Sequence, residues 1–528
     1  IDPSITGVVN DESDNCAVGI IATYTDDFTN LVSCDEEGFV IRTWQLDDGN
    51  GNIIEQDQII WIEPVPLVIP VVTDDILCDS AFTNIELTSP NVYISGAVTF
   101  NYSVVETGGV TGFTTPRNGL PVGHVIRDQL INPTDEIQTV TYTITPVSPG
   151  GCGNGTGVDV VITVNPTARL SVDIPETVYC DSSQVSFTVT DGLTSSTGSR
   201  VYSVTRVYND LAVHIEGEVP GLDDNQDYSV ALTDDLRNLT PAVQTVQYIF
   251  KALIKDPQGD GTPIECNEGV DTTITITINP TPLLSVVIPE EIYCDSSSVS
   301  ITVTDELLSS TGSNAYHLTR TYDDSKVLIE SQRPGILTNQ AYGAITDEVR
   351  NLTAEPQTIT YRFKPVILDP RGDGSIVECS EGGDTTITIT VNPTARLSVD
   401  IPETVYCDSS QVSFTVTDGL ISATGPRVYS VTRVYNDLAV HIEGEVPGLD
   451  DNQAYGVALS DDIRNLTSDV QTVSYIFKAL IKDPQGDGTP VECNEGVDTT
   501  ITITINPTPR LSVDIPEAIY CDSSTVSI

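Results

Sequence analysis

The sequence has no methionine, two tryptophans and four histidines among its 528 residues. Basic residues are also scarce, because 23 lysines and arginines stand against 76 aspartates and glutamates, for a formal net charge of −53. Nucleic acids and anionic lipids bind basic patches, so we expect neither as a partner. Apolar runs stay shorter than the ~18 residues that a membrane helix needs, and we expect no membrane insertion.

Signatures of catalysis are missing as well. The histidines are scattered, and there is no Gly-x-Ser-x-Gly elbow, phosphate-binding loop or HExxH motif. We therefore expect no catalytic residues and no enzyme. Hydrophobic residues make up 39% of the chain, enough for packed cores, so disorder is not expected. The chain lacks an initiator methionine and stops inside an apparent strand, which suggests a piece of a longer protein.

Internal repetition is the strongest pattern. The segment ARLSVDIPETVYCDSSQVSFTVTDGL occurs at 168–193 and again, unchanged, at 395–420. Short Asn-Pro-Thr linkers recur between the copies, and proline there ends a strand. The predicted domains are 1–64, 65–166 (a shorter, looser copy), 167–280, 281–393, 394–507 and the start of a further copy at 508–528.

Hydrophobic residues within a copy alternate with polar ones, which predicts strands with one buried face. In 167–280 the strands are expected near 169–174, 184–190, 200–208, 211–216, 228–232, 243–251 and 271–278. About seven short strands per copy are typical of an antiparallel β-sandwich. The fold class is therefore all-β, a tandem array of sandwiches. Short linkers should hold it as a stiff rod with roughly 40 Å per unit.

The cysteines lack zinc-site spacing and predict disulfides in an exported protein. Those expected to pair are Cys16, Cys34, Cys78, Cys152, Cys180, Cys266, Cys294, Cys379, Cys407 and Cys493. One scheme closes each copy on itself, as in Cys180–Cys266. The other joins the last cysteine of one copy to the first cysteine of the next, as in Cys152–Cys180. We favour pairing within copies, with Cys16–Cys34 separate, and each bond could add about 4 kcal/mol.

Several motifs resemble a known family. Cys180-Asp181-Ser182-Ser183, Arg237-Asn238-Leu239-Thr240 and the run Gln244–Phe250 are similar to the PKD-like, immunoglobulin-type repeats of giant Bacteroidota surface proteins. The segment 1–64, with Asp14-Asn15-Cys16 and Gly51-Asn52, resembles an HYR-type domain. SprB-type gliding-motility adhesins are the closest match. The resemblance implies export by type IX secretion, location on the outer-membrane surface, partners in the gliding machinery, and attachment to a substratum or polysaccharide.

Each full copy contains an acidic Asp-Pro-x-Gly-Asp-Gly loop. Such loops can bind Ca²⁺, which prefers oxygen ligands, but these do not match an EF-hand, and a solvated turn is the favoured interpretation. The candidate ligands are Asp256, Asp260, Asp369, Asp373, Asp483 and Asp487. One loop spells the cell-attachment tripeptide Arg371-Gly372-Asp373, but the other two have glutamine first, so we interpret the arginine as drift in a turn.

The resemblance also implies O-glycosylation at Asp-Ser/Thr sites, against the alternative of plain strand starts. The candidates are Ser80, Thr272, Thr385 and Thr499. Trp44 and Trp61 are expected in a core rather than in a carbohydrate platform. The favoured function is a stalk or filament of a surface adhesin. Repeats that themselves bind glycan, or accessory modules of a secreted polysaccharide-degrading enzyme, remain alternatives.

Overall fold

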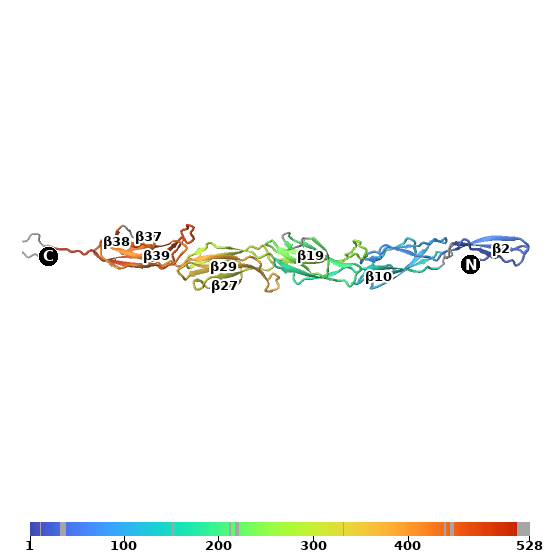
Figure 1. Cartoon of the computed structure of the whole chain (residues 1–528), viewed down its shortest axis with the longest axis horizontal. Helices are drawn as coiled ribbons and strands as arrows, with labels where there is room; N and C mark the ends of the chain where they lie inside the picture. The colour runs from blue at the N-terminus through green and yellow to red at the C-terminus, as the bar shows by residue number, and fades with distance from the viewer. Residues whose placement is uncertain are drawn as a thin grey trace, which may run out of the picture.

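The computed structural model describes residues 1–10, 12–31, 38–149, 153–210, 213–216, 221–330, 332–437, 440–443 and 448–514. The chain is an elongated row of β-structures that follow one another in sequence order, with the N- and C-terminal parts at opposite ends (Figure 1). In the described part the single helix is the four-residue α1, Pro3–Thr6, and no helix is long and apolar enough to cross a membrane. The all-β prediction is confirmed.

Strands β12–β21 form two facing sheets, which we call sandwich 2. One sheet has the order β12-β14-β18-β16, and the other β13-β21-β19-β15-β17, with β20 paired to β19. The bounds are β12 Leu170–Asp173, β13 Val178–Tyr179, β14 Ser183–Asp191, β15 Ser199–Tyr208, β16 Val213–Glu216, β17 Gly221–Gln226, β18 Leu232–Asn238, β19 Gln244–Lys255, β20 Glu265–Cys266 and β21 Thr272–Ile278.

The alternation in the sequence produces the core of sandwich 2. Val185 and Phe187 of β14 face Tyr248 and Phe250 of β19, and all four side chains are fully buried. The ring of Phe187 lies 4.5 Å from that of Tyr248, centroid to centroid, in a tilted contact. Side chains between these positions point to solvent, as a two-residue period requires.

Six of the seven expected strands are present. The strand expected at 228–232 is wrong, because residues 228–231 connect β17 to β18 through a turn and β18 begins only at Leu232. Four strands were not expected: β17, β18, and the two-residue strands β13 and β20, which are too short to show a period. β13 pairs in parallel with β21, and β20 pairs with the end of β19. These two short strands decide where the cysteines lie.

Sandwiches 3 and 4 repeat this topology. Sandwich 3 comprises β22 Leu284–Val287, β23 Ile292–Tyr293, β24 Ser297–Asp305, β25 Ser313–Thr321, β26 Val327–Ile329, β27 Gly335–Gln340, β28 Gly343–Asn351, β29 Gln357–Leu368, β30 Glu378–Cys379 and β31 Thr385–Val391. Sandwich 4 comprises β32 Leu397–Asp400, β33 Val405–Tyr406, β34 Ser410–Asp418, β35 Arg427–Tyr435, β36 Val440–Glu443, β37 Gly448–Gln453, β38 Leu459–Asn465, β39 Gln471–Lys482, β40 Glu492–Cys493 and β41 Thr499–Ile505.

Sandwich 1 is smaller, with sheets β5-β11-β10-β7-β8 and β4-β6-β9. Its strands are β4 Ile69–Val72, β5 Ile76–Leu77, β6 Ile85–Thr88, β7 Thr99–Glu106, β8 Arg117–Pro121, β9 Val125–Ile126, β10 Gln138–Val147 and β11 Val158–Val164. The strands before it form one antiparallel sheet of β1 Thr23–Asp27, β2 Gly38–Asp47 and β3 Ile53–Ile62. Among the described residues this N-terminal part is therefore a single layer rather than the expected sandwich.

The two tryptophans lie in the N-terminal sheet. Trp44 is half-buried, and its indole N–H donates to Gln58 Oε1 at 2.9 Å. Trp61 is 50% exposed and contacts Phe39 through one side of its ring. The core prediction is thus wrong for Trp61, because the described residues of the N-terminal part form one sheet with no second sheet to cover the side chain.

Candidate functional site: the junctions between sandwiches

The two cysteines of a sandwich lie at opposite ends of it. Cys180 follows β13, whose Tyr179 pairs with Ile278 at the C-terminal end of β21. Cys266 ends β20 and pairs with Ile254 near the end of β19, where β21 has not yet begun. β19 has 12 residues and a length of roughly 40 Å. Since a disulfide needs Cα atoms within about 7 Å, Cys180 cannot bond Cys266.

Each disulfide instead joins one sandwich to the next. The bonds are Cys78–Cys266, Cys180–Cys379 and Cys294–Cys493, with Cα–Cα distances of 5.2, 5.3 and 5.2 Å. The pairing expected within copies is therefore wrong, and so is the other scheme, which would join Cys266 to Cys294. The prediction that these six cysteines form disulfides is confirmed.

The remaining cysteines divide into two groups. Cys16 and Cys407 are exposed and carry free thiols. Cys34, Cys152 and Cys521 lie outside the described residues, so the expected Cys16–Cys34 bond is not part of the described structure. Cys407 occupies the same position in sandwich 4 that Cys180 and Cys294 occupy in sandwiches 2 and 3.

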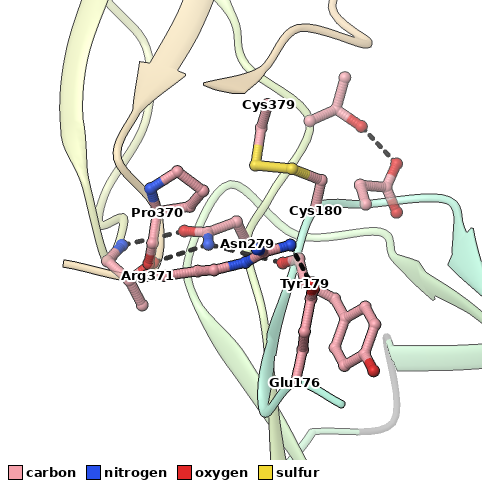
Figure 2. Close-up of a disulfide and its surroundings, with 10 residues drawn as sticks. Glu176, Tyr179, Cys180, Asn279, Pro370, Arg371 and Cys379 are labelled. Atoms are coloured by element: carbon pink, nitrogen blue, oxygen red, sulfur yellow. Dashed lines mark hydrogen bonds and ion pairs between the residues drawn. A yellow bond between two sulfur atoms is a disulfide. The ribbon is translucent and has the colours of Figure 1, made fainter. Parts of the chain in front are cut away.

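In addition to the disulfide, the linker asparagine forms hydrogen bonds with both sandwiches at a junction. Asn279 is fully buried, and its backbone N–H donates to the carbonyl oxygen of Tyr179 at 2.9 Å. Its side-chain amide reaches into the next sandwich, where Nδ2 donates to Thr311 Oγ1 at 2.7 Å and Oδ1 accepts from Thr311 N–H at 2.9 Å (Figure 2). Asn165 and Asn392 make the same contacts with Thr197 and Thr424.

Asp181 of the Cys-Asp-Ser-Ser motif connects the three recurring motifs at this end of the sandwich. Its Oδ1 accepts from the backbone N–H of Asn238 at 2.6 Å, and its Oδ2 accepts from Thr281 Oγ1 of the linker at 2.5 Å. Asn238 in turn donates to the carbonyl oxygen of Ile278, the last residue of β21, at 3.0 Å. The Cys-Asp-Ser-Ser and Arg-Asn-Leu-Thr motifs that suggested the resemblance are therefore parts of one junction, together with the linker.

The acidic loops dock on the preceding sandwich. Gln258 Nε2 donates to the carbonyl oxygen of Ile76 at 2.5 Å, and Gln485 Nε2 does the same to Ile292. The equivalent residue Arg371 forms an ion pair with Glu176, beside the Cys180–Cys379 disulfide (Figure 2). The variable position of the loop is thus a contact between sandwiches, which explains why long polar side chains stand there.

The aspartates of these loops bond to their own backbone. Asp256 Oδ1 accepts from the N–H of Asp260 at 3.1 Å, and Asp260 Oδ1 accepts from the N–H of Thr262 at 2.9 Å. Hydrogen bonds from Thr262 lower the pKa of Asp260. In the described part, the single close group of three potential metal ligands is Cys180, Cys379 and Glu381, and its sulfurs form a disulfide. Calcium binding by the loops stays a prediction.

The candidate glycosylation residues are partly accessible. Thr272, Thr385 and Thr499 are half-buried first residues of β21, β31 and β41, which agrees with strand starts as well as with modification. Ser80 is half-buried, and its Oγ lies 3.2 Å from Asp79 Oδ2. Glycosylation at these four positions stays a prediction.

Two acidic groups also face each other across every junction. The side chains of Glu268, Glu381 and Glu495 are exposed, but neighbouring protein at the junction partly desolvates each carboxylate and raises its pKa, and the carboxylates of Asp79, Asp181 and Asp295 in the preceding sandwich raise it further. A raised folded-state pKa favours the protonated form in the folded protein. The contribution of these glutamates to the stability of the folded protein is therefore largest below the pKa that they have in the unfolded chain. It is lost as the pH rises through their higher pKa in the folded protein.

We therefore expect a variant with Glu268→Gln, Glu381→Gln and Glu495→Gln to melt at a higher temperature than the wild type at pH 7. The advantage should disappear near pH 4, where the wild-type glutamates are protonated. Calorimetry at both pH values checks this. Glu355→Gln serves as the control, since Glu355 contacts the junction loop through its backbone carbonyl oxygen and not through its carboxylate. An equal gain at pH 7 and pH 4 would contradict the electrostatic explanation.

Residues 75–168 match a family model described as a PKD-like domain. No curated protein matches the sequence. The protocadherin gamma B2 extracellular cadherin domains 3–6 share 10% identity over 84% of this chain and 100% of that chain, with a TM-score of 0.25. The human desmocollin-1 ectodomain shares 12% over 96% of each chain, with a TM-score of 0.23.

The N-terminal eight Ig domains of the Down syndrome cell adhesion molecule share 10% identity over 90% of this chain and 54% of that chain, with a TM-score of 0.29. TM-scores this low carry no argument about function. The PKD-like match, the tandem sandwiches and the three disulfides define the class of protein: the chain consists of repeat domains of an extracellular protein.

Proposed function

We propose that the chain is the stalk of a secreted adhesin on the surface of a bacterium, and that it extends and stiffens a filament that serves attachment and gliding motility. The observation that carries the proposal is the junction, which is built in the same way three times from a disulfide, a buried linker asparagine and a docked loop. Near-identical copies joined so tightly add length without adding a new binding specificity.

The family resemblance of the junction motifs supports the finer parts of the proposal. These are a Bacteroidota source, export by type IX secretion, a place on the outer-membrane surface and a partner in the gliding machinery. We also propose the domain division 1–64, 65–166, 167–280, 281–393 and 394–507, with a further copy beginning at 508. The other domains of the same chain are the immediate partners, and an extracellular substratum or polysaccharide is the distant one.

Small-angle scattering of the oxidised protein tests the stalk. We expect a rod on the order of 200 Å long, from five units at ~40 Å each, in calcium and in chelator alike, because the disulfides and asparagine hydrogen bonds at the junctions join protein atoms directly. A rod that bends or shortens in chelator would assign calcium to the aspartate loops. A compact particle in both buffers would contradict the stalk, and binding to a glycan array would favour the alternative of glycan-binding repeats.

A further inference from the structure

The disulfides do not follow the order of the sandwiches along the chain. Cys78–Cys266 closes a loop with a sequence separation of 188, and Cys180–Cys379 and Cys294–Cys493 each close one of 199. Because each bond starts before the β14-type strand of one sandwich and ends near the last strand of the next, the loops overlap. The order Cys78, Cys180, Cys266, Cys294, Cys379, Cys493 makes the three rings interlaced rather than nested.

A short, extended segment joins Cys266, where the first disulfide-bonded loop ends, to Cys294, where the third loop begins. It begins at the N-terminal end of sandwich 2, runs along it as β21, crosses the linker, and continues along sandwich 3 as β22 and β23. β23 pairs with the last residues of β31, so Cys294 lies at the far end of sandwich 3.

This segment spans two whole sandwiches almost at its full extension. At about 3.3 Å per residue, a segment of roughly 28 residues reaches ~90 Å, and two sandwiches of ~40 Å occupy about 80 Å. Little slack is left. The segment from Cys379 to Cys407 repeats the arrangement along sandwiches 3 and 4 with the same length.

We infer that the interlaced disulfides make the rod inextensible under tension between Cys78 and Cys493, so that pulling force bypasses most of the folded chain. The covalent path from Cys78 passes to Cys266, follows the extended segment to Cys294, and passes to Cys493. Residues 79–265 and 295–492 lie outside this path. Unfolding of sandwich 2 or sandwich 3 therefore cannot lengthen the protein, in contrast to a chain of domains joined only by linkers.

A second covalent connection crosses the junction between sandwiches 2 and 3. The linker peptide at Asn279 belongs to the path through Cys266 and Cys294, while the disulfide Cys180–Cys379 lies beside it and belongs to a separate path (Figure 2). The biological use of this design rests on the stalk function proposed above: an adhesin that is pulled transmits force without yielding. The mechanical property itself rests on the connectivity alone.

Optical tweezers on the full chain, held by peptide tags at its two ends after alkylation of free thiols, test the inference. The oxidised wild type should show no lengthening from residues 79–265 and 295–492 below forces that break covalent bonds. Reduction should add on the order of 1,300 Å of contour length, because these residues then join the path at about 3.4 Å each.

Two matched double variants give opposite results if the path is right. Cys180→Ser with Cys379→Ser should leave the maximum length of the oxidised chain unchanged, because Cys78–Cys266 and Cys294–Cys493 still carry the force. Cys78→Ser with Cys266→Ser should add roughly 500 Å, since tension must then follow Cys180–Cys379 and return to Cys294. Contour length depends on covalent connectivity, so the test holds even where a variant is less stable.

Either of two results would overturn the inference: an oxidised wild type that lengthens by the full amount, or equal lengthening of both double variants. Peptide mapping without reductant, done on the same samples, confirms which bonds are present. Rod shape is measured separately by scattering. A compact but inextensible protein would therefore contradict the stalk and leave the load path standing, and an extensible rod would do the reverse.

Discussion

Reduction of the three disulfides is expected to lower the thermal stability of the protein more than any single substitution. Each bond restricts the unfolded chain by closing a loop with a separation of 188 or 199 residues. In the chain-entropy model such a loop contributes about 5 kcal/mol, and overlapping loops contribute less than the sum. The effect should appear as a lower midpoint temperature in calorimetry.

The experiment needs complete reduction, because Cys266, Cys379 and Cys493 are fully buried. The protein should be reduced in denaturant, refolded with reductant present, and compared with an oxidised sample taken through the same steps. A variant with all six bonded cysteines changed to alanine is the control, and reductant should not change its melting. An unchanged midpoint in wild-type protein whose thiols are shown to be free would refute the stabilising role.

Removal of a buried cation is expected to have the second largest effect. Arg320 of β25 forms a bidentate ion pair with Asp347 of β28, with Nε–Oδ2 and Nη2–Oδ1 distances of 2.8 and 3.0 Å. The two side chains are 4% and 3% exposed, and Tyr361 OH also donates to Asp347 at 3.0 Å. Arg320→Met leaves the carboxylate buried without its cation, which should destabilise sandwich 3 by about 3–5 kcal/mol.

Arg362→Met is the matched control for Arg320→Met. Arg362 lies on the neighbouring strand β29 and pairs with Asp384, but its side chain is 61% exposed, so its loss should cost no more than about 1 kcal/mol. Hydrogen exchange of the β25 and β29 amides in urea reports on sandwich 3 alone. Equal effects of the two substitutions would show that burial does not decide the strength of the pair.

The buried carboxylate has different partners in sandwich 1 than in sandwiches 2, 3 and 4. Arg206–Asp234 and Arg433–Asp461 repeat the pair in sandwiches 2 and 4. In sandwich 1, Asp128 instead accepts from Tyr142 OH at 2.8 Å and from the N–H of Thr114 at 3.0 Å. Neutral donors satisfy the carboxylate there, so the looser sequence of residues 65–166 keeps the fold with a different buried network.

The sequence by itself determined the all-β architecture and most of the long strands. Alternation along a strand, as at Val246, Tyr248 and Phe250, is a local pattern, and burial of one strand face follows from it directly. The repeat period, the Asn-Pro-Thr linkers and the expectation of disulfides were equally readable. The turn at 228–232 was taken for a strand because its few apolar residues imitate the alternation.

Only the tertiary structure shows which cysteines and which loop residues meet at the junctions between sandwiches. Which cysteines meet depends on the two-residue strands β13 and β20, whose pairing with β21 and β19 joins residues far apart in sequence. Spacing along the chain gives no information about which end of a sandwich a cysteine reaches. For the same reason, the loop at Arg371 was interpreted as a turn, because its partner Glu176 lies 195 residues away in another sandwich.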